Sequence, residues 1–142
     1  MKLRTLPAIM ALAGLGFSAP VLSQGISDDV IRIGFITDMS GVYSDVDGPA
    51  GAEYIRMAIE DLGGEVNGKK IELLVADHQN KADIASARAR EWFDEQKIDL
   101  LIGGTNSSTS LAMAGVAAVK KKPFISIGAG ASDLTNAHCT PY

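Results

Sequence analysis

The side chains that could bind a ligand follow four short apolar runs of the sequence, and they are mostly hydroxyls, amides and glycines. Such groups offer hydrogen bonds without carrying a charge. Ser107 and Ser108 lie at the start of an expected helix, where free backbone N–H groups and the helix dipole attract an anion such as a carboxylate. These serines could instead cap the helix, and adjacent hydroxyls can serve both roles. The candidate ligand-binding residues are Tyr43, Asn106, Ser107, Gly128, Ala129 and Gly130.

Tyr43 lies in the longest of these polar segments, residues 37–48. Its ring could form a wall over a ligand while its hydroxyl bonds to the ligand. The alternative is that Tyr43 anchors this loop on the helix that follows it. In the last loop, Gly128 and Gly130 would let a ligand approach the backbone closely.

Catalytic and metal-binding patterns are missing from the sequence. It has no G-x-S-x-G, no H-E-x-x-H and no phosphate-binding lysine among its glycines, and its two histidines are His78 and His138. The acidic residues Asp38, Asp45 and Asp47 do not have the spacing of an EF-hand loop. We therefore expect no enzyme and no metal site, and we interpret His78 as a polar loop residue.

Asp77 ends the second apolar run, where dinucleotide-binding proteins place the acid that binds a ribose. The first loop lacks the G-x-G-x-x-G fingerprint of those proteins. We therefore expect no nicotinamide, flavin or other cofactor. Asp77 is expected to bond to its own loop, through Asn80 or nearby amides.

Four short apolar runs predict strands, and segments with apolar residues at helical spacing lie between them. Asp47 can cap the first helix, Pro49 suits its first turn, and Gly63 and Gly64 stop it. This alternation predicts an α/β fold with a doubly wound parallel sheet covered on both faces. The loops after the strands then converge at one edge, where such sheets bind ligands. The expected strands are residues 30–36, 71–76, 100–102 and 124–127, the helices 49–62, 83–96 and 108–121, and the loops 37–48, 77–81, 103–107 and 128–132.

The first 23 residues have the order of a secretory signal peptide. Lys2 and Arg4 precede an apolar stretch at 6–17, and small residues follow, so that cleavage is expected before Gln24. A membrane anchor is the competing interpretation, but the apolar stretch falls short of the about 20 residues that span a bilayer. The sequence therefore predicts export and a single mature domain at 24–142.

Charge and cysteine content exclude further classes. Without Lys2 and Arg4, 11 lysines and arginines face 17 aspartates and glutamates, a formal charge of −6. Nucleic acid is therefore not an expected partner. Cys139 is the only cysteine, so no disulfide can form within these residues.

Four segments together resemble the branched-chain-amino-acid-type, leucine-binding-protein-like solute-binding proteins of ABC transporters. They are Ile33-Gly34-Phe35-Ile36-Thr37-Asp38-Met39-Ser40-Gly41, Ala76-Asp77-His78-Gln79-Asn80-Lys81, Ile102-Gly103-Gly104, and Ile125-Ser126 leading to Ser132-Asp133-Leu134-Thr135. The resemblance implies a type I periplasmic binding fold, in which two α/β lobes close on a solute. This chain would be the first lobe, and we expect it to be truncated and to bind solute weakly.

The resemblance also implies roles for individual residues. Tyr43 would line the pocket, Ser107 would meet the ligand carboxylate, and the backbone at Gly128 and Gly130 would contribute. Amino-acid binders often carry a threonine just after the fourth strand, where this chain has Gly130 and Ala131. The implied ligand is a small organic acid, in particular an aromatic carboxylate, or an amino acid.

The implied partner is the permease of an ABC transporter, and the implied location is the periplasm. The same fold also serves as a sensory or regulatory ligand-binding domain, which is the alternative function.

Overall fold

The computed structural model describes residues 25–142, and the expected signal peptide at 1–23 lies outside them. Within these residues the strands are β1 (Ile31–Thr37), β2 (Glu65–Val66), β3 (Lys69–Asp77), β4 (Leu100–Gly103) and β5 (Phe124–Ser126). The helices are α1 (Ser44–Asp47), α2 (Pro49–Asp61), α3 (Ala82–Glu91) and α4 (Ser107–Lys120), with a π-helical turn η1 (Trp92–Gln96) and a 3₁₀ turn η2 (Ser132–Leu134).

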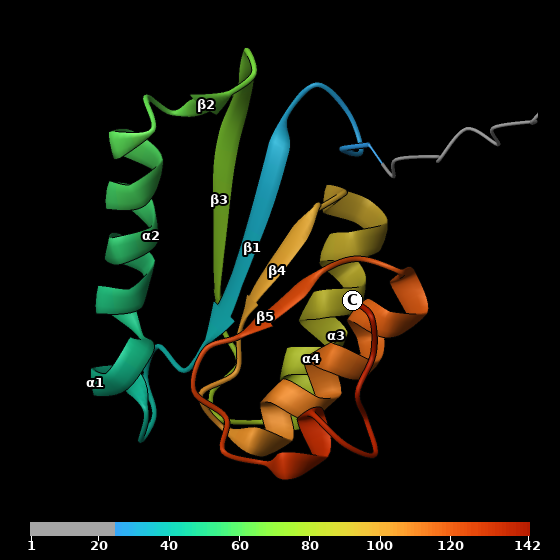
Figure 1. Ribbon diagram of the computed structural model, residues 1–142. Coiled ribbons are helices and arrows are strands. Elements are labelled where there is room, and N and C mark those ends of the chain that lie inside the picture. Colours follow the sequence, from blue (N-terminus) through green and yellow to red (C-terminus); the bar gives the residue numbers. More distant parts are fainter. Residues whose placement is uncertain (1–24) are drawn as a thin grey trace, which may run out of the picture.

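The strands form one sheet in the order β2-β3-β1-β4-β5 (Figure 1). All pairs except β2 with β3 are parallel, which confirms the expected doubly wound α/β class. The short antiparallel pair was not expected. It turns at Asn67 and Gly68, whose positive φ angles of 52° and 76° are those that an Asn-Gly hairpin requires.

Helices cover both faces of the sheet, as expected, but unequally (Figure 1). The core lies between the sheet and the pair α3 and α4, where Ile36 and Leu101 are fully buried. Gly34 of β1 faces Trp92 there, and a Cβ atom on Gly34 would lie 2.8 Å from the indole ring. Trp92 is 6% exposed and belongs to this core.

The opposite face of the sheet is covered by α2 among the described elements. Phe35 packs there against Gly51 of α2. One helix is narrower than four strands, so a groove of about 350 Å³ remains open, and Ile125 is 48% exposed. The groove is lined by Ile33, Tyr54, Ile55, Ala58, Ile59, Leu62, Ile71 and Ile102.

The expected cap on α2 is wrong. Asp47 ends the unexpected short helix α1, and the N-cap position of α2 is Gly48, without a side-chain hydrogen bond. The carboxylate of Asp47 is therefore turned inward and is 8% exposed. Pro49 begins α2 as expected, because proline lacks the N–H that a first turn leaves unpaired.

Within the described residues, no helix has both the length and the apolar character that crossing a bilayer requires.

Candidate functional site

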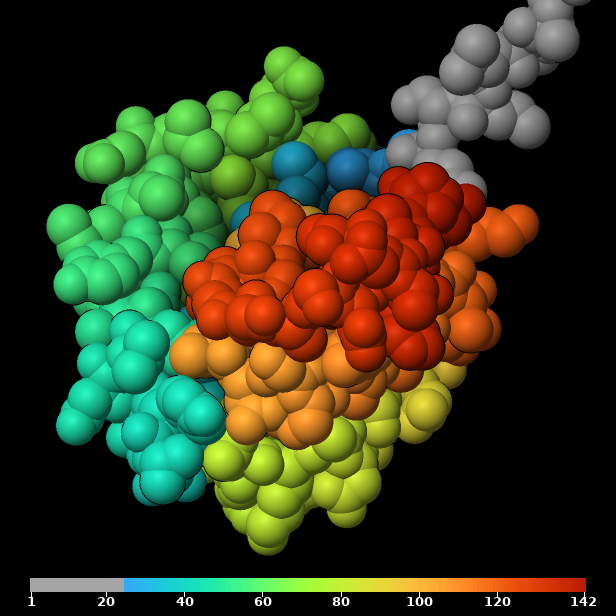
Figure 2. All heavy atoms as spheres, turned by 60° about the horizontal axis from the view of Figure 1, so that its bottom comes forward, coloured from blue at the N-terminus to red at the C-terminus, as the bar shows by residue number. Residues whose placement is uncertain are grey.

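The loops that follow β1, β3, β4 and β5 meet at one edge of the sheet. Strand register brings them there, because Thr37 pairs with Asp77, Ile36 with Gly103, and Gly103 with Ser126. Figure 2 brings this edge forward and shows the first loop beside the orange segments near β5. The convergence expected from the sequence is therefore present.

Asp38 holds the backbone of the first loop. Its carboxylate is fully buried and accepts hydrogen bonds from the N–H groups of Gly41 (2.8 Å) and Tyr43 (3.0 Å). Gly41 lies so close that a Cβ atom there would be 2.5 Å from this carboxylate. Tyr43, partly exposed, is thereby fixed at the edge by its main chain.

Asp77 connects the second loop with the first. Its carboxylate accepts from the N–H of Gln79 (2.7 Å), which confirms the expected bond within its own loop. It also accepts from the N–H of Met39 (3.0 Å) and the hydroxyl of Ser40 (2.6 Å). Burial raises the pKa of Asp77, but these three hydrogen bonds outweigh it and hold the pKa below its usual 3.8.

His78 is in the second loop, as expected, but it is 1% exposed and not a surface residue. Its ring Nδ1 accepts a hydrogen bond from the backbone N–H of Asn80 (3.0 Å). The backbone N–H of His78 donates to the carbonyl of Thr37 (2.8 Å). Burial lowers the pKa of His78, although the charges of Asp38, Asp77 and Asp47 act against it. Burial therefore favours the neutral imidazole.

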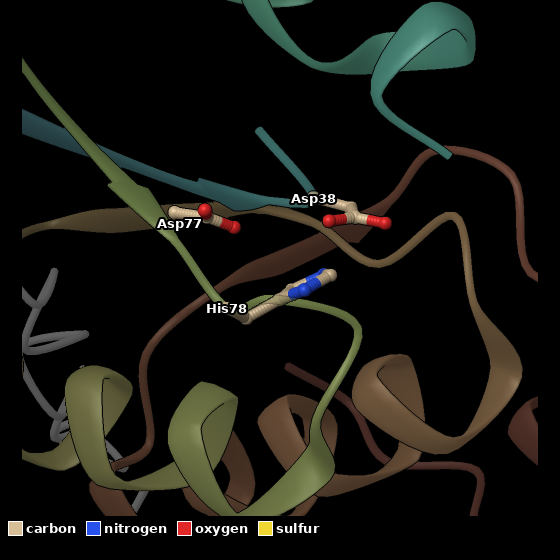
Figure 3. A group of neighbouring side chains, drawn as sticks. All are labelled: Asp38, Asp77 and His78. Atoms are coloured by element: carbon tan, nitrogen blue, oxygen red, sulfur yellow. The ribbon is translucent and has the colours of Figure 1, made fainter. Parts of the chain in front are cut away.

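Figure 3 shows Asp38, Asp77 and His78 gathered beneath these loops. Each offers one potential metal-ligating atom, and the three atoms lie within 4.8 Å of one another. The hydrogen bonds argue against a metal, however. Because Nδ1 of His78 accepts from Asn80, the proton of the neutral ring is on Nε2, and a proton there blocks coordination through that nitrogen.

The third loop gives α4 a different cap from the one expected. Asn106, not Ser107 or Ser108, is the N-cap, and its side-chain oxygen accepts from the N–H of Ser108 (2.7 Å), the hydroxyl of Ser108 (2.6 Å) and the N–H of Thr109 (3.4 Å). Asparagine competes well for this position because its oxygen reaches two free N–H groups. The oxygen of Asn106 is therefore occupied, whereas the hydroxyl of Ser107 forms no hydrogen bond with the described residues.

Two contacts join the third loop to the fourth. The hydroxyls of Ser110 and Ser126 are 2.7 Å apart, and Gly128 lies against Thr105, with 3.4 Å between a Cβ atom built on the glycine and Cα of the threonine. Gly130 has open space around it. A Cβ atom on Gly128 would therefore make an ordinary van der Waals contact with Thr105, and one on Gly130 would meet nothing within 4 Å.

The edge carries both polar groups and exposed apolar side chains. Three cavities lie elsewhere, between α3 and α4, between α2 and the sheet, and beside Asp99, and none is lined by a candidate ligand-binding residue. Tyr43, Ser107 and Gly128 lie at this edge, where amides and hydroxyls are found beside exposed apolar side chains such as Val42 and Ile127. Such a surface can hold a small ligand.

Comparisons with known proteins agree with this description. A family model described as periplasmic binding protein matches residues 30–142. A periplasmic binding protein from Burkholderia mallei is 64% identical to the chain, with a TM-score of 0.79, and the match covers 80% of this chain and 30% of that one. A comparison with curated proteins found no match.

Two further solved structures are similar. A branched-chain amino acid ABC transporter periplasmic ligand-binding protein from Burkholderia xenovorans LB400 is 38% identical, with a TM-score of 0.75, over 79% of this chain and 30% of that one. A solute-binding protein of an ABC transporter from Rhodopseudomonas palustris BisB5 was solved in complex with 3,4-dihydroxybenzoic acid. It is 28% identical, with a TM-score of 0.70, over 76% of this chain and 30% of that one. The chain thus spans about 30% of the length of these proteins.

Proposed function

The chain belongs to the periplasmic binding protein family, and from this premise we propose that it is part of the extracytoplasmic solute-binding component of an ABC transporter. It contributes one wall of a solute site at the carboxyl edge of its sheet. The contacts are Tyr43, Asn106, Ser107, Gly128, Ala129 and Gly130, with Asn106 acting mainly through its main chain because its side-chain oxygen caps α4.

The free hydroxyl of Ser107 carries this proposal. It lies in the first turn of α4, a helix of 14 residues, where the backbone dipole attracts negative charge. The neighbouring Asn106 caps the helix, so Ser107 has no structural hydrogen bond to give up within the described residues. A hydroxyl in that place is suited to donate to a ligand carboxylate.

The ligand is a small organic acid, with aromatic carboxylates preferred over amino acids. An α-ammonium group needs an acceptor, and the nearby carboxylates of Asp38 and Asp77 already accept from loop N–H and hydroxyl groups. No hydroxyl side chain is present at Gly130 or Ala131. The similar protein from Rhodopseudomonas palustris was solved with an aromatic acid, which supports the same class.

Family membership supports the partner and the location that we propose. The bound solute is delivered to a membrane permease, and the chain works in the periplasm after loss of residues 1–23. It carries out no reaction on the solute. The similar protein from Burkholderia xenovorans is named for branched-chain amino acids, which are the competing ligand class.

Chemical-shift mapping of the ¹⁵N-labelled chain tests the proposal, because it detects weak binding to a single wall of a site. Benzoate should shift the amide resonances of Tyr43 and Ser107, and leucine should shift them less. Ser107→Ala should weaken benzoate binding about three- to tenfold, the usual effect of one lost hydrogen bond. Ser108→Ala is the matched control, since that hydroxyl already donates to Asn106. Saturable shifts with leucine and none with benzoate would reverse the preference.

A further inference from the structure

His78 is the most deeply buried ionisable base of the described chain that has no role in the proposed site. It is 1% exposed, and its backbone N–H donates to the carbonyl of Thr37 at 2.8 Å, which fixes it to the end of β1. Its Nε2 finds no hydrogen-bond partner among the described residues. Leaving such a donor unpaired costs stability.

The ring of His78 is held in one protonation state by the main chain. Nδ1 accepts the N–H of Asn80 at 3.0 Å, which requires a free lone pair on that nitrogen. This bond closes a tight loop in which Gln79 and Asn80 both have positive φ, 52° and 55°. Left-handed backbone is costly for residues with a side chain, so the loop depends on such bonds to keep its shape.

This loop and the loop that carries Tyr43 are fastened to each other. Asp77, next to His78 in sequence, accepts from Met39 and Ser40, and Asp38 accepts from the N–H of Tyr43 at 3.0 Å. The carboxylates whose charges act on His78 come from three elements: Asp38 after β1, Asp47 in α1 and Asp77 at the end of β3. Potential ligating atoms of Asp38 and Asp77 lie within 4.8 Å of one of its ring nitrogens. Asp47 is 8% exposed, and neither of its oxygens has a partner among the described residues.

We propose that His78 is a positioning residue for the loop that carries Tyr43, and that it acts only while its imidazole is uncharged. When a proton binds Nδ1, the lone pair that accepts from Asn80 is lost and two N–H groups face each other. The imidazolium then attracts the carboxylates of Asp38 and Asp47. Since Asp38 holds the main chain of Tyr43, the loop loosens as the surroundings become acidic.

For ligand binding, the consequence is weaker capture of solute at acid pH, and this part rests on the proposed function. The loosening of the loop does not rest on it. A protein exposed to the medium outside the inner membrane meets changes of pH directly, so a proton-dependent loop would matter there.

Two measurements on the full chain without ligand test the proposal. Nitrogen chemical shifts of His78 at neutral pH should show Nδ1 unprotonated and Nε2 protonated. Hydrogen-exchange protection factors of the Asn80 and Tyr43 amides, corrected for intrinsic exchange, should both fall about three- to tenfold as His78 becomes protonated. A proton found on Nδ1 at neutral pH, or a Tyr43 amide whose protection stays constant while His78 titrates, would overturn the proposal.

Substitutions separate positioning from simple packing. The side chain in His78→Asn has an oxygen that can accept from the N–H of Asn80, and it cannot titrate. In this variant the hydrogen-exchange protection of the Tyr43 amide should therefore stay high at every pH. His78→Ala should lower the protection at every pH, and His138→Asn, at an exposed histidine, should keep the wild-type pH profile. A pH-dependent loss that persists in His78→Asn would contradict the role of His78. Failure to bind benzoate at any pH would bear on the proposed function alone.

Discussion

The hydroxyl of Ser40 donates a hydrogen bond of 2.6 Å to the carboxylate of Asp77, across 37 positions of the sequence. The bond joins the ends of two neighbouring strands, β1 and β3, and with the Met39 N–H it closes one side of the candidate site. The loop that carries Tyr43 is thereby tied to the end of β3.

Replacing Asp77 should loosen this edge. Asp77→Ala removes the acceptor for Met39, Ser40 and Gln79 and should lower the free energy of unfolding by about 1–3 kcal/mol, because these bonds are only partly shielded from water. Urea denaturation followed by circular dichroism measures the change. Asp45→Asn, at an exposed carboxylate of α1, is the control and should have little effect. Equal stability of the two variants would contradict the bridging role of Asp77.

The contribution of Asp77 to the free energy of unfolding should be lost at acid pH, in a range set by its pKa. Its pKa in the folded chain lies below the usual 3.8, so the unfolded chain binds the proton more readily. The stabilisation is complete above pH 3.8 and is lost as the pH falls through the folded-state pKa. Unfolding curves recorded between about pH 5 and about pH 2 should show a steeper loss of stability for the wild type than for Asp77→Ala.

His78 should make stability depend on pH at a higher range. Its folded-state pKa lies below 6.5, so the unfolded chain takes up a proton first and is favoured as the pH falls below 6.5. The free energy of unfolding should therefore decrease from about pH 7.5 to about pH 5.5, and the decrease should be smaller in His78→Asn. A decrease of the same size in both proteins would assign it to other groups.

Two glycines should respond to alanine in opposite directions. Gly104 has a φ of +86°, and a Cβ atom there would lie 2.6 Å from the hydroxyl of Ser110, so Gly104→Ala should cost about 2–4 kcal/mol. A Cβ atom on Gly115, inside α4, meets nothing within 4 Å, and Gly115→Ala should stabilise the helix by about 0.5–1 kcal/mol. Thermal unfolding of both variants checks the prediction, and a stable Gly104→Ala protein would refute the close approach.

The cap of α4 should be separable from ligand contact. Asn106→Ala removes the side-chain acceptor for Ser108 and Thr109 and should cost about 1 kcal/mol, whereas Asn106→Asp should retain the cap. Ser107→Ala should change stability by less than about 0.5 kcal/mol, since its hydroxyl has no partner among the described residues. Chemical denaturation of the three variants gives the comparison. A large loss in Ser107→Ala would mean that this hydroxyl has a structural role.

Much of the fold could be predicted from the sequence because its signals are local. The β-branched run that became β1 and the spacing of small and apolar residues in α4 each identify an element within about one residue of its observed bounds. Caps were less predictable, because Asn106, Ser107 and Ser108 can all cap a helix and only the chain path decides among them. The hairpin at Asn67 and Gly68 was missed although its Asn-Gly pair is a strong turn signal.

By itself, the sequence determined the α/β class, the parallel sheet and the edge at which the loops meet, since periodicity and right-handed crossovers depend on residues close along the chain. It also determined the family, which the comparison with residues 30–142 confirms. Only the tertiary structure decided that Asp77 holds the first loop, that His78 is buried among carboxylates and that Asp47 is turned inward. These facts depend on distances between residues far apart in sequence, and such distances are set by how the loops fold over the edge of the sheet.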